Sequence, residues 1–286
     1  MTAGGTALLA VAHGSRDPRH AATVRALTAR LRAHAPGARV AFAFLDHNAP
    51  TVGAAVDRLA AEGASEVTAV PLLLGNAYHA KVDLPALLRE SAVRHPGLTL
   101  RQAPVLGPSP LLGAALRRRL AEAGAGSAGD RSTGLLLGWA GSSDPGAVAA
   151  VRDLAAGLHG VAGPVATAAA GQAPASVTEA VELLRAAGAR RIALARYVIA
   201  PGLLPDRLAD AARAACAERG LGLTVAQVLG DAPELASLAA ARAYSSRPVA
   251  AITGSSVPVP VPVGPVPVVP EAADAGAARR ERRVSA

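Results

Sequence analysis

The amino-acid sequence predicts an α/β fold of two tandem domains, each a parallel sheet with helices on both faces. Short apolar segments alternate with longer amphipathic segments, which is the pattern of strand–helix units whose strands run parallel. The chain also repeats itself: residues 7–31 and 134–158 align without gaps and are identical at twelve of twenty-five positions. The matching segments recur about 125 residues apart, and an internal repeat of that size predicts two copies of one domain.

The first copy contains four predicted strand–helix units. Its strands are continuous apolar runs, as expected for a sheet that is covered on both faces. Pro18 suits the first turn of a helix, and the preceding Asp17 is a predicted N-cap, as is Asp144 in the second copy. The predicted strands lie at 7–12, 39–45, 66–74 and 98–104, and the predicted helices at 18–34, 50–62, 82–94 and 109–123.

The repeat and the composition divide the chain into four segments. The first copy is predicted at 5–123 and the second at 134–246, joined by a linker at 124–133 that is rich in Gly and Ser. After the second copy, proline occupies alternate positions, which excludes ladder hydrogen bonds and favours an extended chain. We therefore predict a Pro-rich disordered tail at 247–286.

Composition and charge exclude several classes of function. The formal net charge of +8 comes almost entirely from arginine, since Lys81 is the only lysine. The arginines are scattered and lack neighbouring aromatic residues, so most are interpreted as solvated surface, and an anionic small molecule is preferred over nucleic acid as a partner. Cys216 is the only cysteine, and neither a signal peptide nor a membrane span is apparent. We expect a cytoplasmic protein that does not bind membranes.

Candidate chemistry lies at the ends of the predicted strands of the first copy. Open parallel sheets bind ligands at the carboxyl ends of their strands, where His13, Asp46 and His79 are expected. Neutral imidazole binds Fe²⁺, Co²⁺, Ni²⁺ and Zn²⁺ and also titrates near neutral pH. The second copy has Ala140 and Ala170 in place of His13 and Asp46, which indicates a functional role. The histidines on predicted helices are interpreted as solvated or capping residues: His20, His34, His95 and His159.

Three motifs of the first copy resemble the small class II chelatases, specifically the sirohydrochlorin chelatases. They are HGSRDPR at 13–19, AFLDHNAP at 43–50 and PLLLGNAYHAKVDLP at 71–85. The resemblance covers residues 7 to about 122, and residues 134 to about 245 as a degenerate second copy. It implies a chelatase-like domain in each copy. It also implies an ATP-independent lyase that inserts Fe²⁺ or Co²⁺, its metal substrate, into sirohydrochlorin for siroheme or cobalamin biosynthesis.

The resemblance also implies roles for individual residues. His13 and His79 match the histidines that bind the incoming metal, and Asp46 stands where the family commonly has a glutamate. The adjacent His47 could compensate for the shorter carboxylate. Insertion requires acceptors for two pyrrole protons, which an imidazole and Asp46 could supply. Because sirohydrochlorin is a polycarboxylate, the predicted substrate-binding residues are Ser15, Arg16, Lys81 and Tyr78.

Alternative functions remain open at this stage. The same histidines could serve a non-enzymatic carrier of tetrapyrrole or metal, which the sequence does not distinguish from an enzyme. A phosphohistidine phosphatase with His13 as nucleophile would need an arginine where this chain has Ala12. No nucleotide is expected, because Lys81 follows Ala80 and not the glycine of a P-loop. In single-domain relatives a homodimer forms the site, so we expect a monomer with pseudo-dimeric halves.

Overall fold

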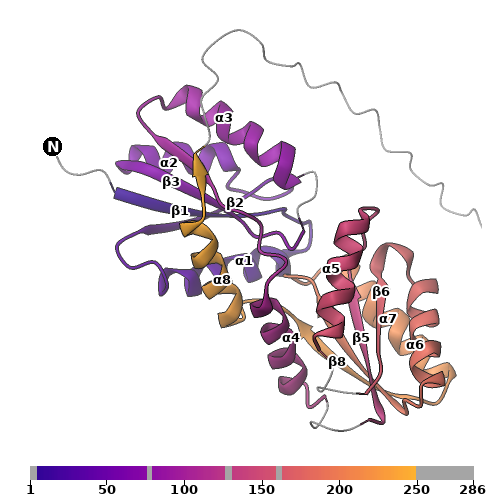
Figure 1. The fold of residues 1–286 in the computed structure, drawn as a ribbon. Coiled ribbons are helices and arrows are strands. Elements are labelled where there is room, and N and C mark those ends of the chain that lie inside the picture. The colour runs from indigo at the N-terminus through magenta and orange to yellow at the C-terminus, as the bar shows by residue number, and fades with distance from the viewer. Residues whose placement is uncertain (1–4, 76–78, 126–130, 159–162, 249–286) are drawn as a thin grey trace, which may run out of the picture. The chain divides into compact units, whose positions relative to one another are not determined.

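The computed structural model describes residues 5–75, 79–125, 131–158 and 163–248 and contains two sheets (Figure 1). Their strand orders are β2-β1-β3-β4-β9 and β6-β5-β7-β8, so the second copy repeats the order of the first. The pairs within β1–β4 and within β5–β8 are parallel. The strands are β1 (Gly5–Ala12), β2 (Arg39–Phe44), β3 (Ala64–Pro71), β4 (Thr99–Gln102), β5 (Thr133–Trp139), β6 (Val165–Ala169), β7 (Arg191–Tyr197), β8 (Gly222–Val228) and β9 (Arg247–Pro248).

The helices follow the predicted strand–helix alternation. They are α1 (Pro18–Arg32), α2 (Val52–Ala61), α3 (Leu84–Arg94), α4 (Pro110–Glu122), α5 (Pro145–Ala156), α6 (Ala175–Ala186), α7 (Leu203–Glu218) and α8 (Pro233–Tyr244). The predicted fold class is thus confirmed. The predicted caps are also confirmed, because Asp17 accepts a hydrogen bond from the Arg19 N–H and Asp144 from the Gly146 N–H. None of the helices in the described ranges is long and apolar enough to cross a bilayer.

Two boundaries in the first copy differ from the sequence prediction by three residues, and the others by at most two. The strand predicted to reach residue 74 ends at Pro71, and the helix predicted from residue 82 begins as a π-helical turn at His79–Asp83 that leads into α3. The edge strand β9, at residues 247 and 248, pairs antiparallel with β4 in a segment predicted to belong to the disordered tail. The rest of that predicted tail, residues 249–286, lies outside the described residues.

Strand β1 is buried on both faces because its alternate side chains enter different hydrophobic clusters. Leu8 and Ala10 belong to a cluster that also contains residues of α1, α4 and α8. Leu9 and Val11 belong to a second cluster, formed with α2 and α3. The continuous apolar run seen in the sequence therefore reflects a strand between two helical layers.

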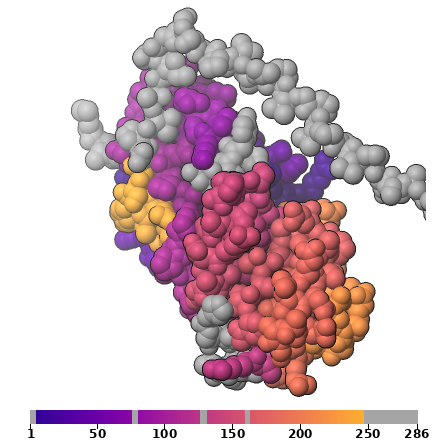
Figure 2. All heavy atoms as spheres, turned by 45° about the vertical axis from the view of Figure 1, so that its right-hand side comes forward, coloured from indigo at the N-terminus to yellow at the C-terminus, as the bar shows by residue number. Residues whose placement is uncertain are grey.

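The last helix of each repeat packs on the sheet of the other repeat. Helix α4 contacts β7 and β8, whereas α8 contacts α1 and β3 (Figure 1). In Figure 2 the yellow atoms at the end of the described chain lie against the purple atoms of the first repeat. Buried residues of both repeats, such as Leu116 and Leu137, consequently belong to one hydrophobic cluster, the shared core. The sequence order did not predict this exchange of helices.

Because the shared core includes both repeats, we expect the described chain to unfold in one cooperative transition. The Leu116 side chain on α4 is only 1% exposed. Leu116→Ala should lower the free energy of unfolding by about 2–5 kcal/mol, because it leaves a cavity in that core. The fluorescence of Trp139 in the second repeat and the far-UV circular dichroism should shift to the same lower urea concentration.

The matched control is Leu183→Ala on α6, whose side chain is 67% exposed. It should change the free energy of unfolding by less than about 0.5 kcal/mol. Two separate transitions in calorimetry, or non-coincident fluorescence and circular dichroism curves, would contradict a shared core.

Candidate functional site

The segments that follow β1 and β2 are joined beyond the ends of the strands. The Asp46 N–H donates to the His13 carbonyl at 2.9 Å, so the parallel pairing continues into the loops. The Ser15 N–H donates to Oδ1 of Asn48 at 2.7 Å. These bonds place His13 and Asp46 together at the carboxyl edge of the first sheet.

Gly14 allows these two loops to approach each other closely. Its φ of 98° lies in the left-handed region, and a Cβ at this position would lie 1.8 Å from the Asp46 carbonyl oxygen. The equivalent Gly141 in the second repeat has a φ of 96°, but its Cβ would meet only the Ala169 side chain, at 3.2 Å, and, more distantly, the Gly171 N–H. The first repeat therefore needs a glycine for both its backbone angle and the contact between loops.

His47 joins His13 and Asp46 at the same edge. The His13 and His47 ring centroids are 6.2 Å apart. His47 donates its backbone N–H to Oδ1 of Asp46 at 2.7 Å, and its Nε2 lies 3.4 Å from Oδ2 of the same carboxylate. Its φ of 63° is rare for a residue with a Cβ and is a form of backbone strain that clusters at functional sites. The sequence suggested His47 only as a substitute for the family glutamate, because backbone strain has no sequence signal here.

The tautomer of His13 follows from one hydrogen bond. Its Nδ1 lies 3.1 Å from the Gly14 carbonyl oxygen, which can only accept. A hydrogen bond to this carbonyl requires the proton on Nδ1, and in that tautomer of the neutral ring the lone pair is on Nε2. The His13 residue is half-buried, whereas the Asp46 side chain is 65% exposed, so the carboxylate is the more accessible of the two groups.

The third predicted segment is only partly described. His79 begins the π-helical turn after β3, and Gln102 Nε2 donates to the Ala80 carbonyl at 2.8 Å, which fastens this turn to β4. π-Helical turns occur frequently at functional sites. The His79 side chain and Tyr78 lie outside the described part of the chain. Within that part, no group of three or more His, Cys, Asp or Glu side chains is arranged to hold a metal ion.

The predicted substrate-binding residues differ in their surroundings. Arg16 and Lys81 are exposed, after β1 and on the π-helical turn respectively. The Ser15 hydroxyl accepts a hydrogen bond from the Asp17 N–H at 3.1 Å, and Ser142 accepts one from the Asp144 N–H at 3.0 Å. Because the second repeat preserves this bond, the Ser15 hydroxyl has a structural role at the start of α1.

His20 is not the solvated or capping residue that the sequence suggested. It is half-buried, and its Nδ1 is inaccessible and has no hydrogen-bond partner among the described residues. Its ring centroid lies 6.2 Å from that of Phe44. Burial, and to a smaller extent the nearby His13, lower the pKa of His20. A neutral imidazole is therefore held beside the candidate site.

The second repeat approaches the site through the segment before α7, the counterpart of the segment that contains His79. A Cβ on Gly202 would lie 3.9 Å from the Ser15 Oγ. Arg19 bridges Asp17 and Asp206, at 2.5 Å from each carboxylate, and so ties the start of α1 to α7. The hydrogen bonds from Arg19 keep the pKa of Asp17 below its usual value.

The comparison with protein families agrees with this repeated architecture. The model of the CbiX family matches residues 7–123 and, separately, residues 134–246. The chain belongs to the CbiX family. The double match confirms the family resemblance seen in the sequence and its two-copy form.

Curated relatives of this CbiX-family chain are sirohydrochlorin chelatases. The sirohydrochlorin ferrochelatase of Bacillus subtilis is 30% identical over 139 residues, which cover 49% of this chain and 52% of the relative. This match therefore spans about half of that relative's length. The sirohydrochlorin cobaltochelatase of Priestia megaterium is 26% identical over 208 residues, covering 71% of this chain and 67% of the relative.

Solved structures show the same fold. SirB from Bacillus subtilis, determined with Fe³⁺, matches with a TM-score of 0.71 and 22% identity over 84% of this chain and 95% of that one. A CbiX described as the terminal enzyme of siroheme biosynthesis in denitrifying bacteria matches with a TM-score of 0.58 and 24% identity over 84% and 98%. At these identities the likeness establishes the fold.

Substitution of the two equivalent glycines tests the contact between the site loops. Gly14→Ala should lower the free energy of unfolding by more than about 3 kcal/mol, because the residue must adopt a strained φ and also displace the Asp46 backbone. Gly141→Ala, with nearly the same φ, should cost about 1–2 kcal/mol. Urea unfolding of both variants gives the comparison, and equal losses would contradict the close approach at Gly14.

His20 should make the protein less stable in acid. Its folded pKa lies below the ordinary value of 6.5, so as the pH falls below that value the unfolded chain takes up a proton that the folded chain resists. The free energy of unfolding therefore decreases towards low pH. His20→Leu should reduce this loss between pH 7.5 and 5.5. It should also raise stability at pH 7.5 by about 1 kcal/mol, because it removes a buried nitrogen that has no hydrogen-bond partner among the described residues.

The control for this variant is His34→Leu, at an exposed position after the same helix. It should leave both the stability at pH 7.5 and its dependence on pH close to those of the unmodified chain. If His20→Leu and the unmodified chain lose stability in parallel on acidification, the lowered pKa of His20 is refuted.

Proposed function

We propose that this CbiX-family chain is a sirohydrochlorin chelatase that inserts Fe²⁺ or Co²⁺ into sirohydrochlorin without ATP. The observation that carries the proposal is the grouping of His13, Asp46 and His47 at the carboxyl edge of the first sheet. The second repeat keeps the scaffold but has Ala140 and Ala170 instead. The activities named for the curated relatives support the same reaction.

The incoming metal ion is the substrate that the imidazoles would receive. We propose His13 as one ligand, through the lone pair on Nε2, and His79, on the segment after β3, as the second. Imidazole suits both Fe²⁺ and Co²⁺, so the ligands do not by themselves select between the siroheme and cobalamin pathways. Two imidazoles leave coordination positions for water and for the macrocycle nitrogens.

Insertion replaces two pyrrole N–H protons by one divalent cation, so two protons must leave the macrocycle. We propose that Asp46 accepts one of them. Its side chain is exposed towards solvent and is held by its neighbour His47, which fixes the direction of the carboxylate. We propose that the adjacent His47 compensates for the shorter side chain of aspartate. The exposed cations Arg16 and Lys81, together with Ser15 and Tyr78, are proposed to contact the polycarboxylate substrate.

We further propose that the chain acts in the cytoplasm as a monomer. The shared core already brings a second copy of the domain against the first, and Gly202 and Asp206 reach the loop of Ser15 and Arg19 from that second copy. The proposed boundaries of the copies remain 5–123 and 134–246, with 124–133 as linker and a Pro-rich tail after β9.

An anaerobic absorbance assay with sirohydrochlorin and either Fe²⁺ or Co²⁺ tests the function. The unmodified chain should exceed the spontaneous rate of insertion. His13→Ala and His79→Ala should lower the enzymatic rate by about a hundredfold or more, because each removes a metal ligand. Asp46→Asn should lower it by about ten- to a hundredfold, because the amide does not accept the proton.

The control is His34→Ala, which removes an exposed imidazole far from the strand ends and should retain full activity. No acceleration with either ion would refute the enzymatic proposal. Tight retention of metal or tetrapyrrole without turnover would indicate a carrier. Sedimentation at the assay concentration should give the mass of a monomer, and an obligate dimer would contradict the pseudo-dimeric arrangement.

A further inference from the structure

Two arginines at equivalent positions of the two repeats hold the segments through which the chain crosses between the sheets. Arg119 on α4 and Arg242 on α8 each stand nine residues after the proline that begins their helix. Arg119 donates from Nε and Nη2 to the Leu229 carbonyl, at 3.2 and 3.0 Å. Arg242 donates from Nη2 to the Leu106 carbonyl at 3.1 Å. Leu229 and Leu106 are themselves equivalent, each four residues before the proline of the helix that follows.

The two contacts are reciprocal. Leu106 leads into α4, the helix that packs on the second sheet, and Leu229 leads into α8, the helix that packs on the first. Each arginine therefore lies on one exchanged helix and binds the segment that leads into the other. An incidental helix–loop contact would not recur at the same register in both repeats. We call these contacts the Arg119 clamp and the Arg242 clamp.

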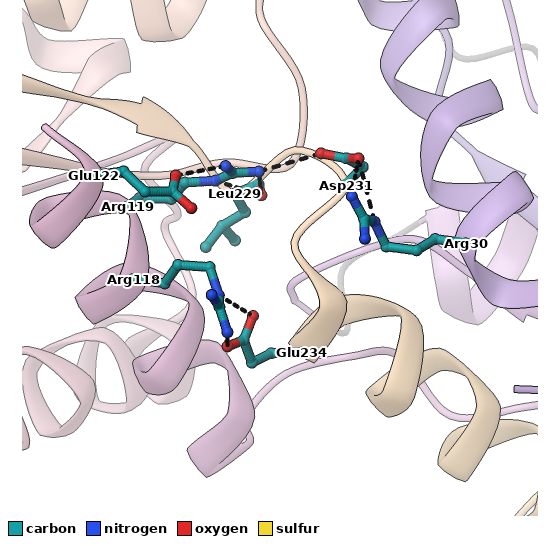
Figure 3. Close-up of polar contacts among 7 residues, drawn as sticks. All are labelled: Arg30, Arg118, Arg119, Glu122, Leu229, Asp231 and Glu234. Carbon is teal, nitrogen blue, oxygen red and sulfur yellow. Dashed lines mark hydrogen bonds and ion pairs between the residues drawn. The ribbon is translucent and has the colours of Figure 1, made fainter. Parts of the chain in front are cut away.

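The Arg119 clamp is reinforced by charge (Figure 3). Asp231, in the same crossing segment, accepts from Arg119 at 3.3 Å and from Arg30 of α1 at 2.9 Å. Next to it, Arg118 donates to Glu234 at 2.8 Å, and this bond lowers the pKa of Glu234. The side chain of Arg119 is only 15% exposed, and partly buried charge-assisted bonds are stronger than exposed ones.

The Arg242 clamp has no such reinforcement among the described residues. Arg242 binds two carbonyl oxygens, of Leu106 at 3.1 Å and of Pro108 at 3.0 Å. Its Nε is buried and has no hydrogen-bond partner in the described part of the chain. The two clamps thus join equivalent positions of the two repeats but differ in their acceptors, since the first includes a carboxylate and the second only neutral carbonyls.

We propose that Arg119 and Arg242 are positioning residues that fix the second repeat against the candidate site. The clamps hold the interface between the two repeats, which we call the joint. The joint sets where Gly202 and Asp206 of the second repeat meet Ser15 and Arg19, before and at the start of α1. The contact between Asp206 and Arg19 is largely exposed, with side chains 39% and 54% exposed, so it contributes little by itself. The partly buried clamps therefore restrict how the two repeats move relative to each other, and the Arg119 clamp restricts this motion more than the Arg242 clamp does.

The joint can be measured on the full-length chain without its substrate. Arg58→Cys on α2 and Glu179→Cys on α6 place spin labels at exposed positions of the two repeats, in a Cys216→Ala background. Double electron–electron resonance should give a narrow distance distribution. Arg119→Met should roughly double its width, Arg242→Met should broaden it less, and the double variant should broaden it most. The width of the distribution for Asp231→Asn should lie between the widths for the unmodified chain and for Arg119→Met.

Arg213→Met is the control, because Arg213 pairs only with Asp210 on its own helix among the described residues. It should leave the distribution unchanged. Far-UV circular dichroism verifies that each variant is folded. Where Arg119→Met does not fold, Arg119→Lys serves instead, since it keeps the charge but not the two-pronged geometry, and it should broaden the distribution to an intermediate width. Unchanged widths in folded Arg119 and Arg242 variants would overturn the proposal.

A second readout rests on the proposed function. If the chain is a sirohydrochlorin chelatase, loosening the joint should raise KM for sirohydrochlorin by about five- to tenfold while kcat stays within about twofold. An unchanged KM in a variant with a broadened distance distribution would show that the clamps do not position the site. Lack of activity in the unmodified chain would refute the function and leave the distance measurement valid.

Discussion

One hydrophobic cluster joins the two repeats. It forms because α4 packs against β7 and β8, and α8 packs against α1 and β3. The composition favours this arrangement. Aromatic residues are 2% of the chain, and the buried face of α8 consists of alanine and leucine. Each alanine removes little apolar area from water, so a core of small residues needs several closely packed layers. Exchange of the last helices supplies such layers to both sheets at once.

Both repeats contribute to the surroundings of the candidate site. The first sheet provides the strand ends that bring His13, Asp46 and His47 together, and the second repeat brings the segment before α7 to the same loop. The repeats have diverged in chemistry while keeping their scaffold. Ser142 accepts a hydrogen bond from the Asp144 N–H as Ser15 does from the Asp17 N–H, and Gly141 keeps the left-handed backbone of Gly14. One repeat therefore carries His13 and Asp46, and the other has Ala140 and Ala170 at the equivalent positions.

More arginines make structural contacts within the protein than the charge pattern suggested. Scattered arginines on helices are ordinarily interpreted as solvated surface. Four of them, Arg30, Arg118, Arg119 and Arg242, instead bind acceptors in the two segments that cross between the sheets or at the first turn of α8. A planar guanidinium with several donors suits this task, because one side chain can satisfy a carbonyl and a carboxylate together. Part of the arginine content of the chain thus serves the contact between the two repeats.

The sequence by itself determined the features that depend on local periodicity. Apolar runs located the parallel strands, the prolines and preceding aspartates located the starts of α1 and α5, and the strand-end rule placed His13 and Asp46 at one edge. The tertiary structure alone decided which sheet each last helix covers, because an amphipathic pattern identifies a buried face and not its partner. It also decided the left-handed backbone of His47, the burial of the His20 Nδ1 and the reciprocal arginine clamps. The clamps arise from contacts between residues distant in sequence, and such contacts leave no local pattern.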